Sequence, residues 1–340
     1  MVNSNDMNTY QGRLRSGHEL RVLVIGFCIL AVAVLFFGAL PAHGEVDLAD
    51  APLFTKINPP PPNLMILQDD SGSMTYEILV RGEYDGKFPN PDRSDTEGFC
   101  YVFDNMGDGY NYTDAGRHME EEGREYWRSQ WYEVNAVYYN PNIVYEPWPD
   151  HAGQTFLPAD IDRPLVHPLQ DGTLNLDRES FRVDIDNDGD GTDDGNLRIA
   201  WSHYFVRSTK GTDYLVILQN GAISYYTFTT DGGIEPNDKI EMVTPVSVSD
   251  VPAEIQRSYD EDRQNFANWF TYYRRREFVA KAAIARVIRN LDNVRVGILG
   301  INNRIVAPLT PIKAVISGEF KDESDTLIET LYAYRSSGGT

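Results

Sequence analysis

The strongest constraint on the fold is an apolar segment that ends abruptly in carboxylates and hydroxyls. Residues 64–74 read Leu-Met-Ile-Leu-Gln-Asp-Asp-Ser-Gly-Ser-Met. The run from Asn63 to Leu67 is apolar on both faces of a strand, which is typical of a central parallel strand covered by helices on both sides. In open α/β sheets, ligands bind beyond the carboxyl ends of the strands. We therefore expect a ligand site at residues 69–74, the DDSGSM loop.

The last part of the chain supplies further elements for the same sheet. Residues 264–291 predict one long amphipathic helix, because apolar side chains at three-to-four spacing form one stripe: Phe266, Phe270, Tyr273, Ala280, Ile284, Val287 and Leu291. Residues 294–301 predict a buried strand, 305–317 an edge strand and 324–334 a helix. This order predicts an α/β protein with an incomplete, doubly wound, Rossmann-like sheet formed by residues 63–74 and 264–340.

The residues between these two pieces have a different character. Residues 75–263 are rich in Tyr, Trp, Asp, Asn and Gly and contain short strand-like runs at 197–206, 213–218 and 223–230. Asn220-Gly221 between the last two runs is a strong signal for a two-residue hairpin turn. We expect a large, mostly β insertion after the first strand, with the aromatic residues of 126–148 in its core. The competing interpretation is that these Tyr and Trp side chains form a binding surface.

The DDSGSM loop has the chemistry of a cation site. Alternate residues of a tight loop can point the same way, so Asp69, Ser71 and Ser73 can offer one carboxylate and two hydroxyl oxygens to one point. Mg²⁺ prefers six oxygens and keeps several waters. The competing interpretation is a polar turn in which Ser73 only caps the next segment.

The DDSGSM loop after a buried strand resembles the metal-ion-dependent adhesion site of von Willebrand factor A domains. In that family an Asp-x-Ser-x-Ser loop, a Thr on a second loop and an Asp on a third loop surround a divalent cation, and a carboxylate of the ligand takes the open position. The resemblance implies the ligands Asp69, Ser71, Ser73 and Thr340, the last in the run Ser-Ser-Gly-Gly-Thr. The third-loop Asp would follow Thr340, so we expect the domain to be truncated.

Four segments together narrow the resemblance to one group of proteins. They are residues 52–74, 137–149, 263–288 and 336–340. They resemble the N-terminal part of the PilC/PilY family of type IV pilus assembly and adhesion proteins, which continue into a β-propeller. The resemblance implies an exported module at the periplasm, outer membrane or pilus tip. It also implies minor pilins, or a host or surface protein, as partners that supply a carboxylate.

A second acidic cluster lies inside the predicted insertion. Residues 184–195 read Asp-Ile-Asp-Asn-Asp-Gly-Asp-Gly-Thr-Asp-Asp-Gly. Two calcium-loop registers compete, one starting at Asp184 and one at Asp186, and neither has the Glu expected at position twelve. The candidate Ca²⁺ ligands are Asp184, Asp186, Asp188, Asp190 and Asp194. The competing interpretation is a solvated acidic turn, in which the crowded carboxylates would repel one another.

The N-terminal region predicts export. Residues 22–40 carry no charge, follow Arg13, Arg15 and Arg21, and precede small residues up to Gly44. We expect residues 1–44 to be a cleaved signal peptide or an uncleaved membrane anchor, with no other membrane contact. Residues 45–62 form a linker that ends in four prolines. The 51 acidic against 30 basic residues disfavour nucleic acid as a partner.

Two rival functions are weighed against the pilus interpretation. A von Willebrand A protein unrelated to pili would share the cation site but not the partners. A subtilisin-like protease would use Asp70 in the run Asp70-Ser71-Gly72, but no histidine stands in a His-Gly-Thr setting and no Gly-Thr-Ser-Met run follows. We therefore expect a binding protein and not an enzyme.

Overall fold

The computed structural model describes residues 60–82, 86–91, 98–103, 117–150, 154–302 and 304–337. The chain divides into two units, Met1–Pro59 and Pro60–Thr340. All described residues belong to the second unit. The predicted signal or anchor (1–44), most of the linker and Thr340 lie outside the described residues.

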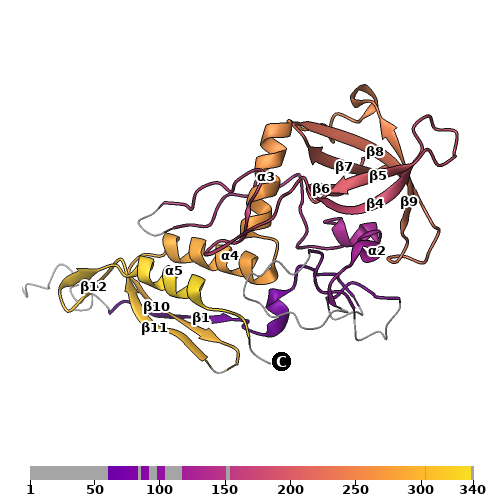
Figure 1. The fold of residues 1–340 in the computed structure, drawn as a ribbon. Helices are drawn as coiled ribbons and strands as arrows, with labels where there is room; N and C mark the ends of the chain where they lie inside the picture. Colours follow the sequence, from indigo (N-terminus) through magenta and orange to yellow (C-terminus); the bar gives the residue numbers. More distant parts are fainter. Residues whose placement is uncertain are drawn as a thin grey trace, which may run out of the picture. The chain divides into compact units, whose positions relative to one another are not determined.

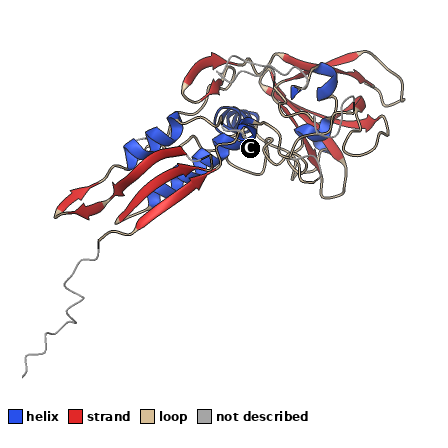
Figure 2. Cartoon of the chain, turned by 90° about the horizontal axis from the view of Figure 1, so that it is seen from below, coloured by secondary structure: helices blue, strands red, loops and turns tan. Residues whose placement is uncertain are grey.

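A three-stranded sheet joins the two pieces of chain that the sequence analysis assigned to one domain. Strand β1 (Asn63–Gln68) pairs in parallel with β10 (Val294–Gly300), which pairs antiparallel with β11 (Arg304–Ile312). Figure 1 shows β1 in indigo beside β10 and β11 in yellow, although more than two hundred residues separate them in sequence. Helices α4 (Arg276–Asn290) and α5 (Ser324–Ala333) pack along this sheet (Figure 2).

The prediction of a central first strand is wrong for the part of the chain that the structure describes. There β1 lies at the edge of the sheet, in the order β1-β10-β11. Leu67 is 68% exposed and Met65 is 45% exposed, and on the same face Ile305 of β11 is 73% exposed. The described helices cover only the opposite face, where Val296 and Ile298 are buried.

The predicted long helix 264–291 is two helices. Helix α3 (Tyr259–Tyr272) ends at Tyr273, and α4 begins after Arg275, whose backbone is extended. The break turns two buried guanidinium groups toward one carboxylate. The Arg274 Nε donates to Glu77 Oε1 at 3.1 Å, and Arg275 forms an ion pair with the same oxygen at 3.6 Å.

The other predicted elements of this region are present. The helix predicted at 324–334 is α5, the strand at 294–301 is β10, and the edge strand at 305–317 is β11. The sequence analysis missed the hairpin of β12 (Ala314–Ile316) and β13 (Glu319–Lys321) that follows β11. The mixed α/β class is thus observed, with several separate sheets.

The regular secondary structure described between β1 and α3 is mostly β-strand, as expected. A six-stranded sheet has the order β5-β4-β9-β8-β7-β6, and Asn220 and Gly221 have positive φ in the tight turn between β7 and β8, as predicted. Its strands are β4 (Glu179–Ile185), β5 (Asn196–Ala200), β6 (His203–Arg207), β7 (Asp213–Gln219), β8 (Ala222–Thr230) and β9 (Ile240–Val246). A hairpin and short helical segments complete this part: β2 (Leu165–His167), β3 (Gln170–Thr173), α2 (Glu121–Arg124), and the 3₁₀ turns η2 (Gly72–Thr75), η4 (Trp127–Gln130) and η6 (Val248–Asp250).

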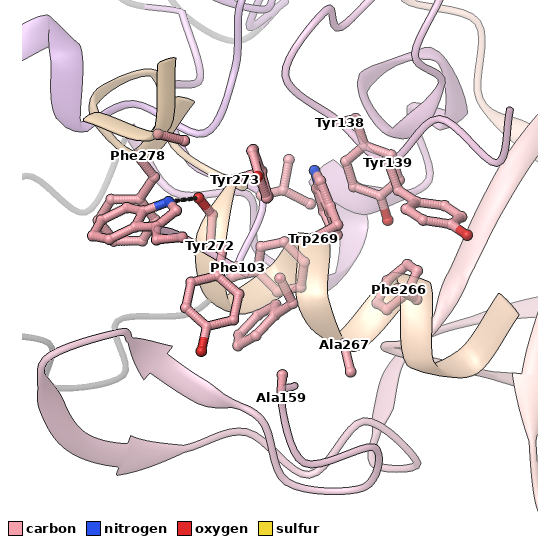
Figure 3. Close-up of a cluster of buried hydrophobic side chains, with 14 of the residues drawn as sticks. Phe103, Tyr138, Tyr139, Ala159, Phe266, Ala267, Trp269, Tyr272, Tyr273 and Phe278 are labelled. Atoms are coloured by element: carbon pink, nitrogen blue, oxygen red, sulfur yellow. Dashed lines mark hydrogen bonds between the residues drawn. The ribbon is translucent and has the colours of Figure 1, made fainter. Parts of the chain in front are cut away.

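Helix α3 carries a dense aromatic core. The ring centroid of Trp269 lies 4.9 Å from that of Tyr138, 5.9 Å from that of Tyr139 and 6.1 Å from that of Phe103. Figure 3 shows these rings gathered around α3, with Phe266 one turn away. The expectation that the aromatic residues of 126–148 fill a core holds for Trp127, Trp131, Tyr138, Tyr139 and Trp148, which are buried.

Candidate metal sites

The DDSGSM loop places the hydroxyl groups of two of its three predicted cation ligands side by side. The backbone N–H of Ser71 donates to Asp69 Oδ1 at 2.9 Å, and the hydroxyl oxygens of Ser71 and Ser73 lie 3.0 Å apart. Ser71 is extended and leads into the 3₁₀ turn η2, which turns the chain sharply at Gly72. Asp69 is exposed, whereas Ser71 is buried and Ser73 is half-buried. The structure thus brings two hydroxyl oxygens together, and the Asp69 carboxylate is hydrogen-bonded within the same loop.

The side chain of Asp70 attaches this loop to the rest of the fold. Its buried carboxylate accepts hydrogen bonds from the Asn302 backbone N–H at 3.1 Å, from the Asn302 side-chain amide at 2.7 Å and from the Tyr334 hydroxyl. Burial alone would raise the pKa of Asp70, but these hydrogen bonds lower it below the ordinary value. Asp70 thus stays ionised and ties β1 to the segments after β10 and α5.

The segment after α5 reaches the DDSGSM loop. The Ser337 N–H donates to the backbone carbonyl of Asp70 at 3.1 Å, and Arg304 Nη1 donates to the Ser337 hydroxyl at 3.2 Å. Thr340, the predicted fourth ligand, lies outside the described residues, so the structure places only Asp69, Ser71 and Ser73 of that set. The two loops that carry the four predicted ligands are nevertheless hydrogen-bonded to each other.

The sequence analysis missed the residues that support the site. Asn302 and Tyr334 belong to no motif, and Asp70 was considered only as part of a protease loop. Their side chains are recognisable only after the ends of β10 and α5 have been placed beside β1. The protease interpretation gains no support from this geometry, because Asn302 and Tyr334 engage the Asp70 carboxylate.

The acidic loop joins β4 to β5. Asp186 is buried, and its carboxylate accepts hydrogen bonds from the N–H groups of Gly189 at 2.7 Å and Gly191 at 3.0 Å. Both glycines have φ above +80°, a conformation that favours glycine. Carboxylate oxygens of Asp186, Asp188 and Asp194 lie within 4.8 Å of one another. This group could hold a metal ion.

The remaining two predicted calcium ligands are not in that group. Asp184 is a residue of strand β4, paired with Asn196 of β5. The Asp190 carboxylate accepts the Thr192 hydroxyl at 2.5 Å and the Thr192 N–H at 2.8 Å, and these two bonds lower its pKa. Asp186, Asp188 and Asp194 fall at positions 1, 3 and 9 of the register that starts at Asp186, so the geometry favours this register over the one that starts at Asp184.

A cleft of about 580 Å³ lies apart from both sites. It is lined by both signs of charge, including Arg286, Arg289, Lys313 and Asp325. Arg289 forms an ion pair with Asp325, and Lys313 donates to the Arg289 carbonyl at 2.9 Å, so these cations already have protein partners.

Comparisons with known proteins give no identification: no family model, no curated protein and no solved structure matches this chain. Within the described residues, none of the helices combines the length and the apolarity that crossing a bilayer requires. The predicted signal or anchor at 22–40 lies outside those residues.

Proposed function

We propose that this chain is an exported, non-enzymatic adhesion or assembly module that binds its partners through a divalent cation. Asp69, Ser71, Ser73 and Thr340 hold the ion, and a carboxylate of the partner completes its coordination. Mg²⁺ suits this site because it accepts a few protein oxygens and retains exchangeable waters. The resemblance to the PilC/PilY family makes a minor pilin, or a host or surface protein, the expected partner.

One observation supports the proposal most directly: the backbone N–H of Ser337 donates a hydrogen bond to the backbone carbonyl of Asp70. An adhesion site of this type needs oxygens from two loops that are distant in sequence. Asp70 lies inside the first loop, and Ser337 lies three residues before Thr340. Three residues span at most about 10 Å, so the chain length allows the Thr340 hydroxyl to reach the serines.

Calorimetry with Mg²⁺ and Mn²⁺ tests the site in the 340-residue chain. Asp69→Ala and Ser71→Ala remove ligands, so both are expected to weaken binding by more than tenfold, on the order of the effect of removing a partner of a metal site. Asp171→Ala is the matched control, because it deletes an equal charge from the exposed face of the β2–β3 hairpin. Equal affinity in the native chain and the Asp69 variant would remove the proposal.

The partner is tested separately, in a piliated host. If the module belongs to the pilus, minor pilins co-purify with the native protein in Mg²⁺, and both Asp69→Ala and Ser71→Ala reduce adhesion or piliation. If the protein binds the metal but no pilins co-purify with it in that host, the alternative is favoured: a von Willebrand A-like binding protein unrelated to pili.

The cluster of Asp186, Asp188 and Asp194 supports a second, structural ion. Ca²⁺ is the candidate, because it accepts six to eight oxygens from a flexible acidic loop. Titration of Ca²⁺ into the Asp69→Ala chain isolates this second site. No heat of binding up to low millimolar Ca²⁺ would leave the loop as a solvated turn.

A further inference from the structure

A buried ion pair lies behind the loop that carries the second half of the proposed site. Glu277 and Lys281 are one turn apart on α4, both are completely buried, and they pair with each other. Buried charges are costly unless all their hydrogen-bonding groups find partners. Further partners of this pair lie at the end of α5 and in the segment that follows it.

The Lys281 ammonium closes the C-terminal end of α5. Its three N–H donors have three acceptors: the Glu277 carboxylate, the Tyr332 carbonyl at 3.0 Å and the Tyr334 carbonyl. The last carbonyls of a helix have no partner within the helix, and a cation there also interacts favourably with the helix dipole. Lys281 therefore fixes the point at which the chain leaves α5.

Glu277 holds the next residues. Its Oε2 accepts the backbone N–H of Ser336 at 3.3 Å, while Oε1 pairs with Lys281. On the other side of the same segment, the Tyr334 hydroxyl donates a hydrogen bond to the Asp70 carboxylate, and the Ser337 N–H donates one to the Asp70 backbone carbonyl. Residues 334–337 are thus held between α4 and the DDSGSM loop, through contacts on both sides.

We propose that Glu277 and Lys281 are positioning residues that set the affinity of the DDSGSM site for its cation. This inference rests on the proposed function of that site. Neither residue touches the ion. They hold residues 332–336, which lead to the segment bonded to the DDSGSM loop, so this segment need not be ordered when the ion binds. Loss of residues that orient metal ligands typically weakens metal binding by about 10- to 100-fold.

The test compares Mn²⁺ affinity and thermal stability in variants of the 340-residue chain. Lys281→Met keeps the side-chain length but removes the three donors. If Lys281→Met fails to fold because Glu277 loses its buried counter-charge, the double variant Glu277→Leu/Lys281→Met removes both charges and still loses the bonds that this pair makes to residues 332–336. We expect at least about tenfold weaker Mn²⁺ binding and faster amide exchange at residues 334–337 in either variant.

The control is an ion pair elsewhere that is nearly as well buried, with side chains 11% and 7% exposed. Arg128 and Asp238 pair at 2.8 Å in the insertion, so Arg128→Met costs stability without touching residues 334–337. Its Mn²⁺ affinity is expected to match that of the native chain. Native affinity in the Lys281 variants, or an equal loss in Arg128→Met, overturns the positioning role. If the native chain binds Mn²⁺ no better than the Asp69→Ala variant does, the proposed function itself is wrong. The two failures are therefore distinguishable.

Discussion

At the scale of single residues, burial and the buried charges around α4 determine the protonation of His167. Its ring is buried, stacks edge-on against Phe278 at 5.2 Å between centroids, and accepts the Leu169 N–H at Nδ1, 3.1 Å away. Burial, reinforced by the positive charges of Lys281, Arg275 and Arg274, lowers the pKa of His167 to about 3. His167 is therefore neutral in the folded protein at any pH above that value.

This neutral histidine predicts a loss of stability in mild acid. In the unfolded chain His167 gains a proton as the pH falls below about 6.5, whereas in the folded chain it does not do so until about pH 3. The unfolded state thus binds more protons in this window, and His167 contributes a loss of up to about 1.4 kcal/mol per pH unit as the pH falls.

The measurement is the free energy of unfolding between pH 7 and pH 5. His167→Asn keeps an acceptor for the Leu169 N–H, because an Asn side chain accepts from the N–H two residues ahead. The variant is expected to show a flatter pH dependence than the native chain. Identical slopes would mean that His167 is protonated in the folded state.

At the scale of elements, periodicity found the helical segment 264–291, helix α5 and strands β10 and β11, but not the break between α3 and α4. The predicted stripe placed Ile284 and Val287 on the core face, yet Val287 is half-exposed. The interruption at residues 273–275 rotates the second helix, so its buried face contains Phe278, Ala282, Ala285 and Ile288, together with Glu277 and Lys281. No hydrophobic pattern could indicate this, because two charged residues occupy the buried stripe.

The candidate site was also predictable only in part, namely where its residues are close together in the sequence. The DDSGSM motif located Asp69, Ser71 and Ser73, because their spacing is local. The roles of Asn302 and Tyr334 depend on which strand ends and helix ends meet, which is a tertiary property. The acidic loop was found for the same local reason, but only the folded turn separates Asp186, Asp188 and Asp194 from their neighbours.

Two glycines of β10 provide a matched pair of substitutions at this scale. A Cβ at Gly300 would lie 2.8 Å from Cγ of Asp70 and 3.0 Å from the Tyr334 hydroxyl. Asp70 is fixed by its hydrogen bonds and cannot move without losing them. Gly300→Ala is expected to cost about 1–3 kcal/mol of unfolding free energy, the usual range for overpacking, and to weaken Mn²⁺ binding.

Gly297 is the control on the same strand. A Cβ there would meet the Sδ and Cε of Met65 at 2.8 Å, but this side chain is flexible and 45% exposed, so it can swing away. Gly297→Ala should therefore change stability by less than about 1 kcal/mol and leave Mn²⁺ binding intact. Equal effects of the two substitutions would argue against a fixed Asp70.

At the scale of the whole described unit, one hydrophobic cluster links the insertion to the α/β part. It runs from Ile78 through the aromatic residues of α3 to Leu327, Ile328 and Leu331 of α5. Trp148 of the insertion stacks on Tyr332 of α5, with 4.7 Å between ring centroids. A shared core of this kind couples the stability of its parts, because neither can open without exposing the other.

The shared core predicts that damage in α5 is detected by tryptophans far away in the sequence. All five tryptophans lie between residues 127 and 269, so their fluorescence reports on the insertion and α3. Ile328→Ala removes a fully buried side chain and is expected to cost about 2–5 kcal/mol, lowering the midpoint of the fluorescence transition and of helical circular dichroism together. Val315→Ala, at a 49% exposed position of β12, should shift neither. If Ile328→Ala instead produced an early loss of helical signal with an unchanged fluorescence midpoint, the two parts would be independent folding units, and the site would depend on α4, α5 and the small sheet alone.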